Sequence, residues 1–282
     1  MGQLLKWLAG MLILASLACL ALASWTYARS EAYLRSFERP PPFQLPIPDD
    51  EVTRARGDHL VRTRGCRGCH GDDLNGQFMW GVASAPGLPQ LARGSPADFE
   101  AALRHGIGAD GRALYSMPSM GFLRLRDADV AAIIAYLRSE PVIDRELPRR
   151  SLPWAIRWDL ARGQDMAMPA VMNRVPPLRL EGEDSPLSRG EYFAMTTCNE
   201  CHGLTLQGDS AFGDEAAPSL AVVASYDETA FKQLLRTGKA LGDRELPRMS
   251  RVARRRFATM TDAEIDDLYA FLRQGPARIA TD

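Results

Sequence analysis

Two pentapeptides decide how this chain folds: Cys66-Arg67-Gly68-Cys69-His70 and, 132 positions later, Cys198-Asn199-Glu200-Cys201-His202. Each has the form C-x-x-C-H, at which a c-type haem is attached to a polypeptide. Two thiols at this spacing on a short turn can reach the two vinyl groups of one porphyrin, and the adjacent histidine is then held against the iron. The sequence therefore predicts two covalently bound haem c groups, one for each pentapeptide.

Paired cysteines also occur in zinc sites and in redox-active dithiols. The cysteine pairs of a zinc site usually lie about 15–20 residues apart, whereas these pairs lie 132 residues apart. A thioredoxin-like dithiol occurs among alternating strands and helices, and no such pattern surrounds either pentapeptide. Haem attachment through Cys66, Cys69, Cys198 and Cys201 is the better interpretation.

The residues that follow each pentapeptide repeat with the same offset of 132. The matched positions are Gly76 and Gly208, Pro86-Gly87-Leu88 and Pro218-Ser219-Leu220, Phe99 and Phe231, Leu103 and Leu235, Arg104 and Arg236, Gly106 and Gly238, and Met117 and Met249. Internal repetition of this kind indicates one supersecondary unit that is used twice.

A methionine lies 47 residues after each motif histidine, as a second axial ligand requires. Histidine with methionine is a standard ligand pair in cytochromes c. We expect four residues to bind the two irons: His70, Met117, His202 and Met249. Methionine is also a common core residue, and Met120 and Met260 lie nearby. Only the register of the repeat favours Met117 and Met249 over these neighbours.

Pro86 and Pro218 are candidates for orienting the axial histidines. A proline carbonyl can accept a hydrogen bond from the second ring nitrogen of such a histidine; alternatively, these prolines only shape their loops. Two histidines, His59 and His105, lie outside the motifs. Thr237 stands at the position equivalent to His105, and we expect both histidines to lie at the surface or to face a partner.

The 282 residues are 46% hydrophobic and carry a net charge of −1. This length suffices for two domains and an anchor, and the charge gives no support for nucleic-acid binding. Only Cys19 lies outside the pentapeptides, so no disulfide framework is possible, and we interpret it as a small apolar residue within the membrane. Haem attachment of this type nevertheless implies an oxidising compartment outside the cytoplasm.

An uncharged run from Trp7 to Ala28 near the amino terminus is long enough to cross a bilayer. Trp7 lies at one end, and Trp25 and Tyr27 lie at the other, as in a retained membrane span. Ala21-Leu22-Ala23 has the form of a signal-peptide cleavage site, so a cleaved signal is the competing interpretation. We favour a single N-terminal span in the bacterial inner membrane, with the haem domains in the periplasm.

We predict six segments along the chain: a membrane anchor or signal segment at 1–29, a proline-rich stalk at 30–49, a first haem c domain at 50–140, a proline-rich strap at 141–185, a second haem c domain at 186–275 and a tail at 276–282. A polar helical stretch should run to Glu38, before Pro40-Pro41-Pro42 forces an extended stalk that lifts the first domain off the membrane. Apolar residues predict a structured strap with one short helix, packed across both domains.

Each haem domain should end in an amphipathic helix. Apolar residues at i, i+3, i+4 and i+7 form one stripe in each helix: Val130, Ile133, Ile134 and Leu137, and then Ile265, Leu268, Tyr269 and Leu272. Asp127 is the expected N-cap of the first helix, and Thr261 with Glu264 forms a capping box in the second. No long strand-like alternation occurs, so the predicted fold class is all-α.

Charge differs between the two motifs, since residues 54–77 sum to +2 and the matched window 186–209 sums to −2. Taken alone, this difference makes the first haem the stronger oxidant. Five arginines crowd around Met249, and they could bind haem propionates, dock a partner or form a solvated face: Arg248, Arg251, Arg254, Arg255 and Arg256. The direction of electron flow therefore stays open.

The motifs, Phe99-x-x-x-Leu103-Arg104-x-Gly106, Met117-Pro118-Ser119-Met120 and the closing helices together resemble the class I c-type cytochromes. They are similar in particular to the di-haem and tri-haem cytochrome c subunits of bacterial membrane dehydrogenases. The resemblance covers about residues 50–140 and 186–275. It implies two tandem class I cytochrome c domains behind an N-terminal transmembrane helix, with the covalent and axial ligands given above.

We therefore expect a membrane-anchored periplasmic di-haem cytochrome c that transfers single electrons between redox proteins of the respiratory chain and is not itself an enzyme. An iron bound on both faces leaves no position for a substrate. One alternative is a dedicated cytochrome subunit of a membrane dehydrogenase or terminal oxidase complex. A di-haem peroxidase is a further alternative, but it needs an iron with a displaceable ligand, and the two matched methionines speak against it.

Overall fold

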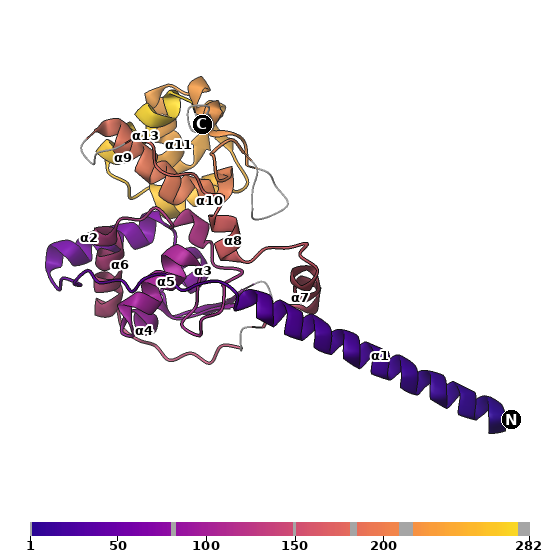
Figure 1. Ribbon diagram of the computed structural model, residues 1–282. Helices are drawn as coiled ribbons and strands as arrows, with labels where there is room; N and C mark the ends of the chain where they lie inside the picture. Colours follow the sequence, from indigo (N-terminus) through magenta and orange to yellow (C-terminus); the bar gives the residue numbers. More distant parts are fainter. Residues whose placement is uncertain (1, 80–82, 149–150, 181–184, 209–216, 276–282) are drawn as a thin grey trace.

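The computed structural model describes residues 2–79, 83–148, 151–180, 185–208 and 217–275. It consists of two helical lobes and one long helix that projects from them (Figure 1). We call residues 50–140 the first lobe and residues 186–275 the second lobe. The first lobe lies next to the long helix, and the second lobe packs on the far side of the first (Figure 1). The predicted tail at 276–282 lies outside the described residues.

The helices are α1 (Gly2–Leu34), α2 (Glu51–Thr63), α3 (Arg67–His70), α4 (Leu88–Ala92), α5 (Pro96–His105), η1 (Ser119–Gly121), α6 (Asp127–Ser139), α7 (Trp154–Ala161), α8 (Met168–Met172), α9 (Pro186–Phe193), η2 (Ala194–Cys198), α10 (Asn199–His202), η3 (Leu220–Ser225), α11 (Glu228–Thr237), η4 (Leu241–Asp243), α12 (Met249–Val252), η5 (Ala253–Phe257) and α13 (Asp262–Arg273). Two antiparallel hairpins join β1 (Gln77–Met79) to β2 (Ala83–Ala85) and β3 (Lys239–Ala240) to β4 (Arg244–Glu245). The fold is all-α apart from these short strands, which confirms the predicted class.

Each lobe is built on the crossing of its opening helix with its closing helix, α2 with α6 and α9 with α13. A glycine lies at each crossing. A Cβ atom on Gly57 would overlap the carbonyl oxygen of Ala132, and one on Gly190 would overlap that of Asp267. The backbones can therefore approach closely only because these two positions lack a side chain.

The closing helices bury the predicted apolar stripes. Val130, Ile133, Ile134 and Leu137 are buried in the first lobe, as are Ile265, Leu268 and Leu272 in the second, with Tyr269 partly buried beside them. The capping box of Thr261 and Glu264 is confirmed. The prediction for Asp127 was wrong: Arg126 occupies the cap position without a side-chain cap. Asp127 instead pairs with Arg104 at 2.7 Å.

The long helix and the stalk differ from the prediction. Helix α1 is continuous to Leu34 and stops short of Glu38. We call the two lobes together with the strap the head. The buried Leu34 packs into the head, and its carbonyl oxygen accepts a hydrogen bond from the Ala113 amide at 2.7 Å, so the helix ends there. The chain from 38 to 49 contains no helix or strand. Phe43 and Ile47 pack against the core of the first lobe, so this segment lies along the lobe and does not act as a free spacer.

The strap contains two short helices, α7 and α8, where one was expected. Helix α7 packs against α1 and not across both lobes. Helix α8 contacts η1 and α5 of the first lobe, while Met168 and Met172 join the core of the second. Helix α8 and, after it, Leu178, which packs against both cores, therefore make the bridging contact that the sequence predicted for the strap.

Candidate haem sites

The first motif forms the short helix α3, with Cys66 at its N-cap position and Gly71 directly after it at φ +85°. His70 is buried, with 6% of its surface exposed. Its Nδ1 lies 2.8 Å from the carbonyl oxygen of Pro86. A carbonyl oxygen only accepts hydrogen bonds, so Nδ1 must carry the proton and donate. Nε2 then keeps its lone pair, which suits it to bind a metal.

The second motif repeats this geometry in α10. Nδ1 of His202 lies 2.8 Å from the carbonyl oxygen of Pro218, and Gly203 follows the helix at φ +83°. Burial lowers the pKa of His202, against the opposing effect of the hydrogen bond to Pro218. A neutral imidazole with a fixed tautomer is the form that serves as a metal ligand.

The motif cysteines form no disulfides. Burial raises the pKa of Cys66 to about 11 and that of Cys198 to about 12, so both thiols are protonated at neutral pH. Redox-active dithiols and zinc ligands have lowered pKa values instead. Among the described residues, no three His, Cys, Asp or Glu side chains are grouped so that they could hold a metal ion. This chemistry suits thioether formation better than a thiolate site.

The structure separates the two methionines of the first lobe. Met117 packs, together with Cys66, against the core of the first lobe. Met120 is fully buried, but its side chain belongs to the core of the second lobe. In the second lobe, Met249 and Met260 both contact a single core, so packing does not separate them there. The arrangement supports Met117 over Met120 as the ligand near His70.

The two lobes interlock by exchanging core residues. Met120 of the first lobe is buried in the core of the second, and Tyr192 of the second is buried in the core of the first. The side-chain nitrogen Nδ2 of Asn199, inside the second motif, donates to the carbonyl oxygen of Met120 at 3.4 Å. The candidate haem sites therefore belong to one packed unit and not to two loosely tethered domains.

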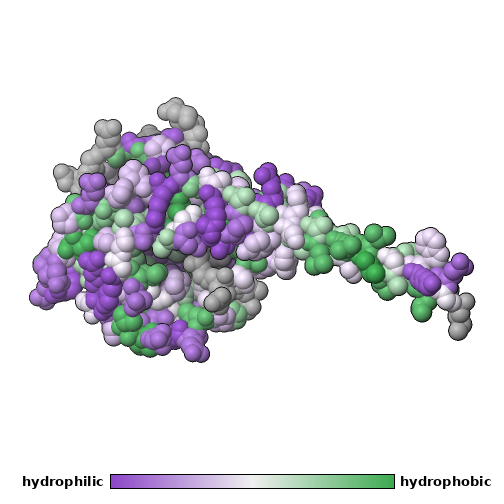
Figure 2. Space-filling view, turned by 60° about the horizontal axis from the view of Figure 1, so that its bottom comes forward, coloured by the Kyte–Doolittle hydropathy of each residue, from purple (hydrophilic) through white to green (hydrophobic). Residues whose placement is uncertain are grey.

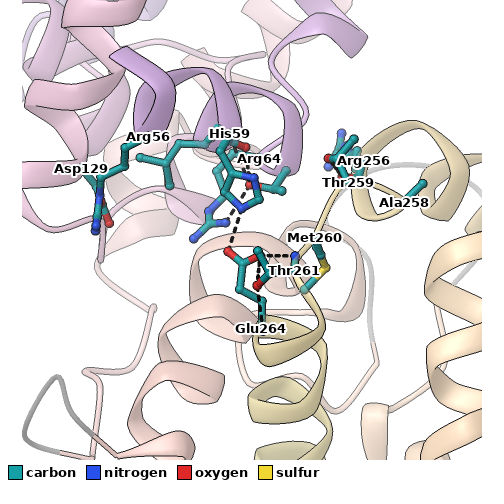
Figure 3. A network of polar contacts seen from close by, with 12 residues as sticks. Arg56, His59, Arg64, Asp129, Arg256, Ala258, Thr259, Met260, Thr261 and Glu264 are labelled. Carbon is teal, nitrogen blue, oxygen red and sulfur yellow. Dashed lines mark hydrogen bonds and ion pairs between the residues drawn. The ribbon is translucent and has the colours of Figure 1, made fainter. Parts of the chain in front are cut away.

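Equivalent positions of the repeat make the polar contacts between the lobes. Asp129 and Glu264 are the third residues of α6 and α13, and His59 and Tyr192 each lie two residues after a crossing glycine. Tyr192 donates a hydrogen bond to Asp129, and Nε2 of His59 lies 2.7 Å from Glu264 (Figure 3). The interface is thus approximately two-fold symmetric. His59 faces the second lobe and not an outside partner, while His105 contacts Glu100 at 2.9 Å.

One guanidinium contacts both motifs. Arg256 donates to Glu200, inside the second motif, at 2.7 Å, and both side chains are 16% exposed. The same side chain fills the space beside Gly65, directly before the first motif, where a Cβ atom would overlap it. Nearby, the buried Arg64 stacks 4.6 Å above the ring of Phe193, and burial lowers the pKa of Arg64. Two cations therefore lie in the interface between the lobes.

Two other arginines near Met249 form exposed ion pairs. Arg254 pairs with Glu245 on the surface at 3.1 Å, and Arg255 reaches Asp72 of the first lobe at 3.6 Å. Sequence analysis missed Arg64, Glu200 and Arg256 as interface residues. The sequence contained a sign of this difference. Cys66 lies nine residues after Gly57, whereas Cys198 lies eight residues after Gly190. This additional residue allows the turn at Gly65.

The residues present fit a haem in each lobe. Each lobe offers two free, half-buried thiols, an imidazole whose Nε2 is directed by a proline carbonyl, and a partly buried methionine. This set of donors is soft and has no carboxylate, as haem c ligation requires. With haem iron bound, such a site supplies a one-electron centre.

Comparison with known proteins supports this chemistry. The family model for cytochrome c matches residues 54–140 and again residues 187–276. The chain is 28% identical over 259 residues to the fructose dehydrogenase cytochrome subunit of Gluconobacter japonicus, which covers 79% of this chain and 53% of that protein. It is 31% identical over 173 residues to the alcohol dehydrogenase (quinone) cytochrome c subunit of Gluconobacter oxydans (strain 621H), which covers 54% of this chain and 35% of that protein.

A third relative is the gluconate 2-dehydrogenase cytochrome c subunit of Pantoea cypripedii, 28% identical over 195 residues, or 60% of this chain and 44% of that protein. The chain thus spans about half the length, or less, of these curated relatives. All three are cytochrome subunits of dehydrogenases. The two matches of the family model cover more than half of the chain, which therefore belongs to the cytochrome c family.

Proposed function

We propose that this chain is the cytochrome c subunit of a membrane dehydrogenase complex and passes single electrons through two haems. The observation that carries the proposal is the set of relatives, which are cytochrome subunits of fructose, alcohol and gluconate dehydrogenases. The interlocked lobes support it, because both motifs contact Arg256 and are held at a fixed separation. A free carrier between respiratory proteins was our first expectation, and the relatives favour the subunit role over it.

In this proposal, each residue set has one task. Cys66 with Cys69 would hold one haem, and Cys198 with Cys201 would hold the other. His70 and His202 would bind iron through Nε2, oriented by the carbonyls of Pro86 and Pro218. Met117 and Met249 would close the opposite face. Thioether ligation favours ferrous iron and so raises the reduction potential.

We further propose that α1 anchors the chain in the bacterial inner membrane, with both lobes in the periplasm. Helix α1 is long and apolar enough to cross a bilayer. Its middle is hydrophobic and stands clear of the head (Figure 2). Covalent haem attachment of this type supports the periplasmic side, because it implies a compartment outside the cytoplasm.

Purification of the full chain from membranes in mild detergent tests the proposed function. We expect a catalytic subunit to co-purify at fixed stoichiometry, and fructose, an alcohol or gluconate to reduce the haems. The double variant Cys198→Ala/Cys201→Ala is the matched control and should keep the partner but carry half the covalent haem. A chain that purifies alone and is reduced only by soluble redox proteins would favour the free carrier instead.

A further inference from the structure

Helix α7 is fixed to one level of α1. The rings of Trp158 and Trp25 meet edge to face with their centroids 6.1 Å apart. The guanidinium of Arg157 lies 4.6 Å above the ring of Tyr27 and donates to the hydroxyl of Ser30 at 3.0 Å. Arg157 is buried by these contacts. The depth of α7 is therefore set by where residues 25–30 of α1 lie.

That depth follows from the geometry of α1. The 18 steps along the helix from Trp7 to Trp25 span about 27 Å, close to the hydrocarbon thickness of a bilayer. Tryptophan and tyrosine concentrate at the level of the lipid headgroups, so Trp25 and Tyr27 mark that level. Because α7 is bound to these residues, it must lie at headgroup depth whenever α1 crosses the bilayer.

The outer surface of α7 suits that environment. Trp154 is 56% exposed, and Trp25 and Tyr27 of α1 are about half exposed. The exposed Arg162 lies with its guanidinium 5.4 Å from the Trp158 ring centroid. Exposed tryptophan with adjacent cations is characteristic of a helix that lies in the membrane interface, where the rings are half wetted and arginine meets lipid phosphate.

We propose that α7 is a second membrane contact, which lies in the headgroup layer of the bilayer that α1 crosses and inserts Trp154 into it. The inference rests on the proposed membrane anchor. Its consequence is a fixed orientation of the head: Leu34 is hydrogen-bonded to Ala113, and the Ala167 amide lies 3.3 Å from the Tyr33 hydroxyl. A helix joined rigidly to the head and flanked by α7 holds the first lobe at one tilt above the lipid.

Site-directed spin labelling of the haem-loaded full chain in phospholipid nanodiscs tests this inference. The motif thiols are consumed by haem, so native Cys19 is the one cysteine left to label, and it reports on the anchor. The variant Cys19→Ser/Trp154→Cys reports on α7, with Cys19→Ser/Ala155→Cys as a second site on the same helix. The variant Cys19→Ser/Val52→Cys is the aqueous control, since Val52 in α2 is 80% exposed and α2 lies far from α1.

Labels at 154 and 155 should be several-fold more accessible to oxygen, relative to a water-soluble nickel complex, than the label at 52. Accessibility at 154 and 155 equal to that at 52, with Cys19 buried in lipid, would overturn the α7 contact and leave the anchor intact. Labels at 154 and 155 shielded from both reagents would show a protein partner instead and overturn it equally. A nickel-accessible or missing Cys19 would overturn the anchor itself, and α7 with it.

Discussion

The two halves of the interface between the lobes occupy equivalent places in the repeat but differ in burial. In one half, Asp129 and Tyr192 are both buried, and Arg56 also pairs with the carboxylate. In the other half, His59 and Glu264 are 29% and 30% exposed. Burial and the adjacent Asp129 raise the pKa of Tyr192, so its hydroxyl remains a donor. The repeat therefore supplies two equivalent contacts with different properties. The contact between Asp129 and Tyr192 is buried, whereas solvent can reach the carboxylate of Glu264 in the other.

The first prediction tests whether the two proposed iron sites are equivalent. Met117→Ala and Met249→Ala should each open one iron to carbon monoxide and lower its potential by roughly 0.2 V, because axial ligands set haem potentials over a range of about 0.8 V. Redox titration and carbon monoxide difference spectra measure both effects. Met120→Leu and Met260→Leu are the controls. Carbon monoxide binding to Met260→Leu, but not to Met249→Ala, would move the ligand to Met260.

The second prediction compares the two halves of the interface. Asp129→Asn should lower the free energy of unfolding by about 3 kcal/mol, because it removes a buried carboxylate that accepts a hydrogen bond from the buried Tyr192 and pairs with the half-exposed Arg56. Glu264→Gln should cost less than about 1 kcal/mol, since its pair is partly exposed. Denaturant unfolding of the haem-loaded chain measures both. Equal losses would contradict the difference drawn from burial.

The third prediction concerns the arginine between the motifs. Arg256→Gln should lower the free energy of unfolding by about 2 kcal/mol, because Glu200 would lose its partner in a largely buried place. Arg254→Gln removes a similar pair from the surface, with Glu245, and should cost less than about 0.5 kcal/mol. The same unfolding assay measures both variants. Equal losses for Arg254→Gln and Arg256→Gln would contradict the larger contribution of Arg256 to stability.

The smallest effect is a pH dependence of the exposed half. Burial raises the pKa of Glu264, but hydrogen bonds from His59 and Thr261 outweigh it and hold the pKa below its ordinary value of 4.5. The charged form thus stabilises the folded state above about pH 4.5, and this contribution is lost as the pH falls through the lower folded pKa. Stability measured from pH 6 downward should fall less steeply in Glu264→Gln than in the native chain. Parallel curves would show that the pair contributes nothing.

The parts of the molecule that the sequence predicted are those set by local spacing. The thiols and histidine of each motif lie within five residues, and the stripe from Val130 to Leu137 lies within one helix, so periodicity was sufficient. The hydrogen bonds from the two histidines to Pro86 and Pro218 span 16 residues each, and the repeat itself pointed to them.

The interface could not be predicted in the same way. Glu264 lies 205 residues from His59, and no periodicity links residues so far apart. The contact depends on how the two folded lobes dock. That docking is determined by the close approach of Arg256 to Gly65 and by the burial of Met120 and Tyr192 in the core of the opposite lobe. The arginine cluster is a similar case: the sequence placed Arg256 near Met249, yet its side chain also lies against Gly65, directly before the first motif. The boundary of α1 at Leu34 likewise depends on tertiary packing.

The exchange of Met120 and Tyr192 has a consequence for rate. Electron tunnelling between two centres falls steeply with distance, and a flexible pair of domains would alternate between fast and slow arrangements. Here each lobe contributes a buried side chain to the other, so separating them would expose both cores to water. If each motif holds a haem as proposed, the hop between them would therefore take place at one distance, without waiting for any domain motion.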